Sequence, residues 1–101
     1  MDQSQYVQRV LDGYRATPGT CGVVRKPDRD FAARLFERGV PLSAVENALV
    51  LAAARRLARP ADAPPLGVIR SLAYFSPVID EVLELRISAA YFEHLRRRMP
   101  R

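Results

Sequence analysis

Apolar residues recur at helical spacing along most of this chain. Between residues 3 and 16 they form a single stripe among polar residues, which predicts an amphipathic helix. The stripe consists of Val7, Val10, Leu11 and Tyr14. A turn-rich segment, TPGTCG at 17–22, ends this predicted helix.

A second helix is predicted to open at KPDRD, residues 26–30. Pro27 suits the first helical position, and Asp28 and Asp30 fall in the first turn, where the helix dipole favours acids. Gly39 suits the left-handed position just past a helix end, so we expect this helix to stop there.

The third predicted helix has the clearest start signal. Ser43 followed by Glu46 matches the capping box, in which each side chain caps the backbone amide of the other residue. From there to Arg59 the chain contains neither glycine nor proline, so we expect one uninterrupted helix.

Residues 27–59 therefore form a helix-turn-helix-like hairpin, which has two interpretations. A helix that enters a DNA groove needs polar side chains in its early turns, and this one offers only Ser43, Glu46 and Asn47. The leucines and valines that follow point in at least three directions, which is typical of a helix buried on most sides. We favour a central core helix and keep groove binding as the alternative.

After a proline-rich connector at 60–65, the pattern predicts a short helix at 66–75 and a new helix opening at Ser76-Pro77. A break at 85–88, with Ser88 as a possible cap, precedes a last helix. The pattern leaves open whether 66–98 forms two helices or three. Together these elements predict an all-α fold, a small bundle of four to five helices in a single domain over 1–101.

Basic charge is segregated along the chain. The net charge is +5, with fifteen arginines and one lysine. Residues 25–59 carry a net +4 and residues 96–101 another +4, whereas residues 60–95 carry a net −3. Such segregation is what a charged surface patch requires, and arginine suits phosphate because its planar fork matches the phosphate oxygens.

Three basic clusters are the candidate nucleic-acid-binding residues. The main cluster closes the third helix, a second precedes the second helix, and a third forms part of a basic tail at 96–101. Their members are Arg55, Arg56 and Arg59; Arg25, Lys26 and Arg29; and Arg96, Arg97 and Arg98. Each cluster taken alone is more simply a solvated helix end.

The sequence argues against an enzyme. His94 is the only histidine and Cys21 the only cysteine, so a nucleophilic triad and a zinc site both lack residues. Neither phosphate-binding glycine motif occurs, and we expect no cofactor and no metal. No apolar run is long enough for a membrane span and the start lacks a signal-peptide pattern, so we expect a cytoplasmic protein.

Two aromatic pairs, at 74–75 and 91–92, also lie near arginines. Exposed aromatic rings stack bases, whereas rings at helical spacing beside leucines belong to a core. We favour the core interpretation for both pairs.

The run LFERGVPLSAVENALVLAAARR, followed by PLGVIRSLAYF, resembles the helical DnaD-type domains of bacterial and phage replication-initiation proteins. The resemblance covers about residues 31–75. It rests on Gly39, Val45, Ala48, Ile69 and Tyr74. It implies a helical DNA-binding accessory factor of replication or of a mobile element. The chain departs from the family in its proline-rich connector and lacks the family's tryptophan near the end, so no functional residue is carried over.

We therefore expect a small, non-enzymatic nucleic-acid-binding accessory protein, with DNA favoured over RNA, that contacts phosphates through its arginines. The alternative is a helical protein-interaction module, either a homodimer or the small subunit of a larger complex. In that case the acidic segment at 76–84 of one chain could meet the basic ends of another.

Overall fold

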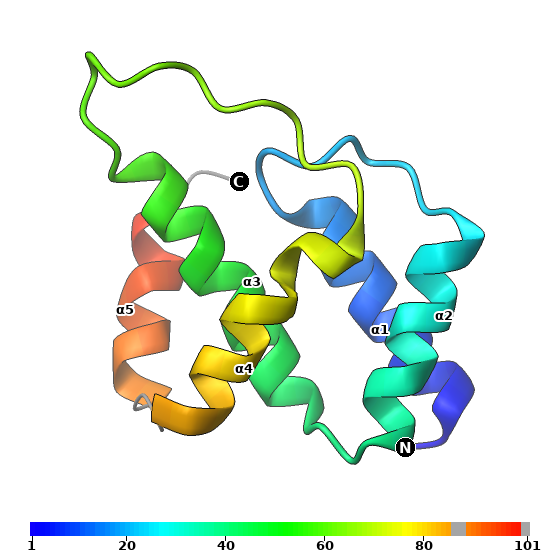
Figure 1. Cartoon of the computed structure of the whole chain (residues 1–101). Coiled ribbons are helices and arrows are strands. Elements are labelled where there is room, and N and C mark those ends of the chain that lie inside the picture. The colour runs from blue at the N-terminus through cyan, green and yellow to red at the C-terminus, as the bar shows by residue number, and fades with distance from the viewer. Residues whose placement is uncertain (86–88, 100–101) are drawn as a thin grey trace.

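The computed structural model describes residues 1–85 and 89–99. In these residues the chain forms five α-helices and one short 3-10 helix, with no β-strand (Figure 1). The elements are α1 (Gln3–Ala16), α2 (Lys26–Glu37), α3 (Leu42–Leu57), η1 (Leu72–Phe75), α4 (Ser76–Leu85) and α5 (Ala89–Arg98). The predicted all-α bundle is confirmed, and its helix-turn-helix-like segment is present as α2, the turn at Gly39 and α3. The predicted break at 85–88 includes residues 86–88, which lie outside the described residues.

Helix α3 is the centre of the bundle. It packs on α1, α4 and α5, while α1 separates it from much of α2 (Figure 1). Its buried residues are Ala44, Val45, Ala48, Leu49, Leu51, Ala52 and Ala53. A helix buried on this many sides has little surface left for a DNA groove. None of the helices in the described ranges is long and apolar enough to cross a membrane.

The predicted capping box of α3 is wrong. The helix begins at Leu42, Pro41 holds the N-cap position with φ −60°, and no side chain caps it. Ser43 thus lies inside the first turn, and Glu46 forms an ion pair with Arg9 of α1 at 3.6 Å. A capping box does occur at the start of α1, between Asp2 and Gln5.

The helix predicted at 66–75 is also mostly wrong, because only Leu72–Phe75 is helical. Residues 58–71, here called the connector, run across one end of the bundle (Figure 1). The backbone N–H of Ile69 donates to the Gly19 carbonyl at 2.8 Å, and the Ile69 carbonyl accepts from the Cys21 N–H at 2.9 Å. The Ile69 side chain is buried. These long-range bonds hold Ile69 in a bridge rather than a helix.

Asp28 joins the start of α2 to the start of η1. It is only 2% exposed, and its Oδ2 accepts from the Arg25 backbone N–H at 2.9 Å. Its Oδ1 accepts from the backbone N–H of Leu72, also at 2.9 Å. Asp28 therefore does more than meet the helix dipole, because it satisfies a buried backbone donor far away in the sequence.

Candidate nucleic-acid interface

Members of all three predicted clusters lie toward the same end of the bundle. Helices α1, α3 and α5 end there and α2 begins there (Figure 1). The last turns of α3 and α5 line one hollow, and the last turn of α3 shares another with the loop after α1. We call this region the basic end. Its side chains are Arg25, Lys26, Arg29, Arg56, Arg59, Arg70, Arg97 and Arg98.

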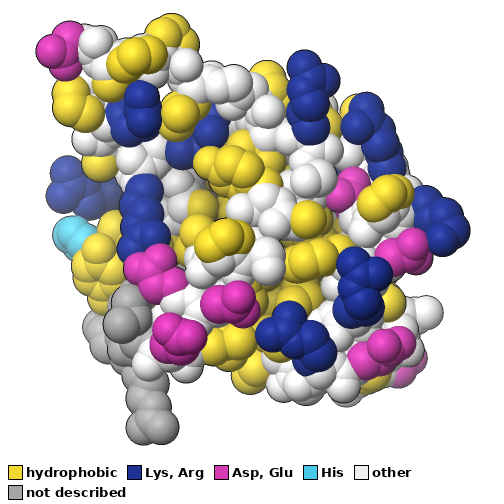
Figure 2. Space-filling view, viewed as in Figure 1, with side chains coloured by type: hydrophobic (Ala, Val, Ile, Leu, Met, Phe, Trp, Pro, Cys, Tyr) yellow, Lys and Arg dark blue, Asp and Glu magenta, His cyan; other side chains and the backbone are white. Residues whose placement is uncertain are grey.

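Few acids offset this charge. Asp28 is buried and hydrogen-bonded to backbone, and Asp30 forms an ion pair with Lys26 at 2.9 Å. Asp62 in the connector is exposed. Figure 2 shows Lys and Arg side chains prevailing over the upper half of the molecule and Asp and Glu over the lower half. The segregation of charge along the sequence thus becomes a segregation in space.

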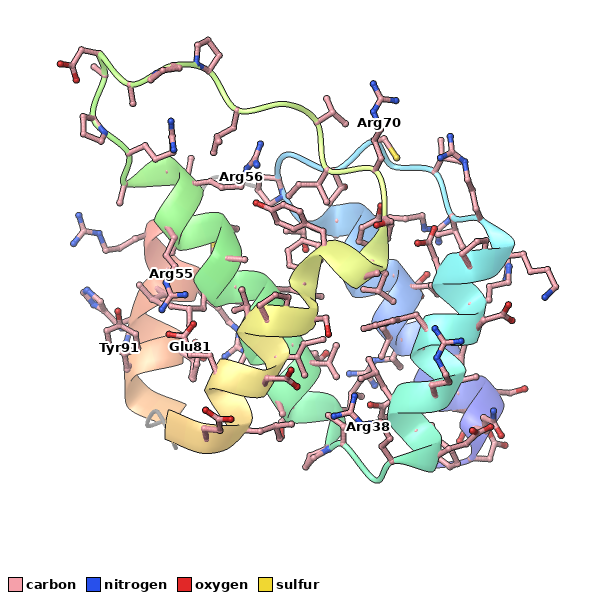
Figure 3. All side chains as sticks on the ribbon, viewed as in Figure 1. Arg38, Arg55, Arg56, Arg70, Glu81 and Tyr91 are labelled. Atoms are coloured by element: carbon pink, nitrogen blue, oxygen red, sulfur yellow. The ribbon has the colours of Figure 1, made fainter. Side chains whose placement is uncertain are left out.

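Arg55 adds no net charge to the basic end, because Glu81 of α4 forms an ion pair with it. Arg55 Nη1 donates to Glu81 Oε2 at 2.7 Å, and Arg55 Nη2 donates to Glu81 Oε1 (Figure 3). The hydrogen bond from Arg55 lowers the pKa of Glu81, and the same bond raises the pKa of Arg55. The first member of the predicted main cluster is therefore charge-compensated.

Arg56 and Arg59 hold the connector in place. Arg56 Nη2 donates to the Gly67 carbonyl at 2.9 Å, and Arg59 Nη2 donates to the Pro64 carbonyl at 2.8 Å. A guanidinium has five N–H donors, so each keeps donors for a further acceptor. Neither arginine forms an ion pair within the described ranges, so both keep their full positive charge.

Arg96 is bonded to other residues of the fold and contributes less than predicted to the basic tail at 96–101. Its Nη2 donates to Asn47 Oδ1 of α3 at 2.7 Å, and its Nη1 lies 3.5 Å from Glu93 Oε2. Arg97 and Arg98 are exposed in the last turn of α5. Residues 100 and 101 of the predicted tail lie outside the described residues.

Arg70 also lies at the basic end, although it was not among the predicted residues. It is exposed at the end of the connector (Figure 3), directly after the bridged Ile69. In the part of the chain that the structure describes, neither Arg70 nor Arg29 makes a side-chain hydrogen bond or ion pair. Arg70 belongs to a sequence segment with net negative charge, so only the fold reveals its place among the other arginines.

In each aromatic pair one side chain is buried and the other is exposed. Phe75 and Phe92 are fully buried, as predicted, but Tyr74 and Tyr91 are 48% and 47% exposed. Successive residues point about 100° apart in an α-helix and about 120° apart in a 3-10 helix. One member of each pair therefore turns outward when the other enters the core. The core interpretation is therefore correct for the phenylalanines and wrong for the tyrosines.

Further polar groups of the described residues line two other hollows. His94 is exposed and lines a hollow with Leu57 and Arg98. A hollow of about 720 Å³ between α1, α3 and α5 contains Glu46, Glu93 and Arg96, each of which forms an ion pair. Across residues 1–85 and 89–99, no three His, Cys, Asp or Glu side chains gather as metal ligands would.

Comparisons of this chain with protein-family models, with curated proteins and with solved structures gave no match in any of the three. The DnaD-type resemblance stays a prediction, because no comparison bears on it. The candidate interface is defined by its geometry and charge.

Proposed function

We propose that this protein is a small nucleic-acid-binding accessory protein of the cytoplasm, which contacts phosphates at its basic end. The observation that carries the proposal is the convergence of basic residues from α2, α3, α5 and the connector at one end of the bundle. These residues are distant in sequence, so their grouping is a property of the fold. The preference for DNA over RNA, and a role in replication or in a mobile element, rest on the DnaD-type resemblance alone.

The proposed contacts are to the backbone of the nucleic acid rather than to base edges in a groove. Phosphate contacts supply affinity and orientation without reading sequence. The early turns of α3 are largely buried, and its arginines, Arg55 and Arg56, lie at its other end. We therefore expect binding with low sequence specificity and strong salt dependence.

The test uses Arg29→Ala/Arg70→Ala, because these two side chains hold no other part of the fold together. Fluorescence anisotropy with labelled duplex and single-stranded DNA and RNA, across a series of salt concentrations, gives the slope of log affinity against log salt. Each lost phosphate contact reduces the slope by about 0.9 for a duplex and about 0.7 for a single strand. We expect the double variant to bind more weakly and to lose up to about 1.8 or 1.4 from these slopes.

The matched control is Arg34→Ala/Arg38→Ala, which removes the same charge from the opposite end of α2. It should leave affinity and slope close to those of the unchanged protein. Equal losses in both double variants would mean that net charge alone causes binding, and no binding at low salt would overturn the proposal.

A protein-interaction module is the second candidate, because carboxylates of α4 already form ion pairs with arginines of other helices and turns in this chain. Glu81 pairs with Arg55, and Asp80 lies 3.7 Å from Arg38. Two side chains near the basic end, Leu57 and Val68, are also apolar and more than half exposed. Sedimentation velocity at low and high salt tests this candidate, which requires a dimer or larger species at micromolar concentration.

A further inference from the structure

We infer that the nucleic acid bound by this protein is single-stranded and that its bases stack on Tyr74 and Tyr91. The inference rests on the proposed function and names its substrate class. Both tyrosine rings are about half exposed, although each is next in sequence to a fully buried phenylalanine. They are the most exposed aromatic side chains in the described part of the chain.

Each tyrosine ring is held by its phenylalanine neighbour. The Tyr74 and Phe75 ring centroids lie 5.2 Å apart with an interplanar angle of 80°, and those of Tyr91 and Phe92 lie 6.0 Å apart at 73°. Both pairs have edge-to-face geometry, which aromatic rings favour. Because the phenylalanines are anchored in the core, the tyrosines stand on the surface with restricted freedom and lose less entropy on binding.

The two rings flank the C-terminal half of α3. Tyr74 lines a hollow of about 350 Å³ together with Arg55, Arg56 and Arg59. Tyr91 lines a second hollow of about 420 Å³ that also contains the ion-paired Arg55 and Glu81. Figure 3 shows Tyr91 beside the Arg55–Glu81 pair, with Arg56 further along the same face. The shared Arg55 makes these two hollows neighbours.

At Tyr74 this arrangement combines the two elements that single-stranded nucleic acids need, an exposed aromatic ring and a basic surface. The charged groups that line the Tyr91 hollow are the paired Arg55 and Glu81, so Tyr91 contributes its ring alone. Arg56 and Arg59, which form no ion pair within the described ranges, line the same hollow as Tyr74. A duplex already stacks its bases on one another and offers no free base face to a protein ring. The tyrosines therefore distinguish a single strand from a duplex, which the arginines alone do not.

The experiment compares Tyr74→Ala and Tyr91→Ala with Tyr74→Phe and Tyr91→Phe, because phenylalanine keeps the ring. Anisotropy titrations use an oligothymidylate and a mixed-sequence duplex of equal length, with polyglutamate as a competitor. Stacking of one base corresponds to a loss of about fivefold to a hundredfold in affinity for each alanine variant. We expect that loss for the oligothymidylate only, with phenylalanine variants within about twofold of the unchanged protein. Since the chain has no tryptophan, quenching of tyrosine emission is a second readout of stacking.

Three results separate this inference from the proposed function. If Arg29→Ala/Arg70→Ala weakens binding but the tyrosine variants do not, phosphate binding stands and base stacking is overturned. If polyglutamate displaces the oligothymidylate at equal charge concentration, the face is a general polyanion or acidic-protein surface and the inference fails. If neither nucleic acid binds at low salt, both proposals fall.

Discussion

The carboxylate of Asp28 accepts a hydrogen bond from the backbone N–H of Leu72, 44 residues later in the chain, at 2.9 Å. The same carboxylate accepts the Arg25 N–H, so one buried side chain satisfies donors of two segments. It fastens the start of α2 to the end of the connector, which places Arg70 near the basic start of α2.

Replacing Asp28 should destabilise the protein strongly. In Asp28→Ala the Leu72 and Arg25 N–H groups lose their acceptor, at a cost of about 3 kcal/mol in the free energy of unfolding. Asp30→Ala is the control, because Asp30 lies in the same turn but forms only an exposed pair with Lys26 and should cost under about 1 kcal/mol. Urea unfolding measures both values, and equal losses would contradict the assigned role of Asp28.

Gly19 and Gly22 test whether the loop after α1 supports Arg56. Both have positive φ, +94° and +75°, so alanine is strained at either position by about 1–2 kcal/mol. Only at Gly19 would the new methyl group meet a neighbour, with Arg56 Nε at 3.0 Å. We expect Gly19→Ala to cost about 1 kcal/mol more than Gly22→Ala, because Arg56 must shift from the Gly67 carbonyl. Equal costs in thermal or urea unfolding would show that Arg56 adapts freely.

Stability should fall in alkaline solution through Tyr14. Burial of its hydroxyl, together with the nearby Cys21 thiol, raises the pKa of Tyr14 from 10.0 to about 12. Because the folded pKa is above the unfolded one, this contribution to stability is present below pH 10 and is lost as the pH rises from 10 to 12. Urea unfolding over this range should show a shallower decline for Tyr14→Phe. Part of the decline should remain, because burial also raises the pKa of Tyr6.

At neutral pH, Tyr14→Phe should be as stable as the unchanged protein or slightly more stable. The Tyr14 hydroxyl is buried and has no hydrogen-bond partner of good geometry among the described residues. Removing a polar group that lacks a partner leaves no donor or acceptor unsatisfied. A clear loss of stability would indicate that the Cys21 sulfur is a true partner of this hydroxyl.

Glu81→Gln should strengthen the proposed nucleic-acid binding. It releases the charge of Arg55 between the two tyrosine-lined hollows and should steepen the salt dependence for a single strand by about 0.7. Asp80→Asn makes the same change of charge beside Arg38, away from these hollows, and should act more weakly. Weaker binding by Glu81→Gln would mean that the ion pair positions Arg55 rather than neutralising it.

Local patterns predicted the elements whose causes are local. The apolar stripe of α1, the glycine after α2 and the all-round apolar character of α3 each depend on neighbouring residues, and each prediction is confirmed. The connector could not be predicted in this way. Ile69 has a helical pattern around it, but its backbone bonds to Gly19 and Cys21, which are about fifty residues earlier in the chain.

The candidate site was also only partly predictable from local sequence patterns. The basic clusters are visible in the sequence, but their common end and the pairing of Arg55 with Glu81 arise from packing of α3 against α4. The outward turn of Tyr74 follows from the burial of Phe75, which helical geometry alone could have indicated. The sequence alone did not show whether Tyr74 or Phe75 would enter the core, because this depends on how η1 packs.

The hydrogen bonds from Ile69 and Leu72 back to residues 19–28 also determine when, during synthesis, the fold can be completed. The ribosome completes α1, α2 and α3 before it adds Ile69, Leu72 and Phe75, whose side chains complete the core. At about 5–20 residues per second, the stretch from 57 to 75 takes roughly one to four seconds. During that interval the Asp28 carboxylate lacks its Leu72 partner, and apolar side chains of the core are uncovered. Translation that stops within the connector would therefore release a product that chaperones and proteases recognise as unfinished.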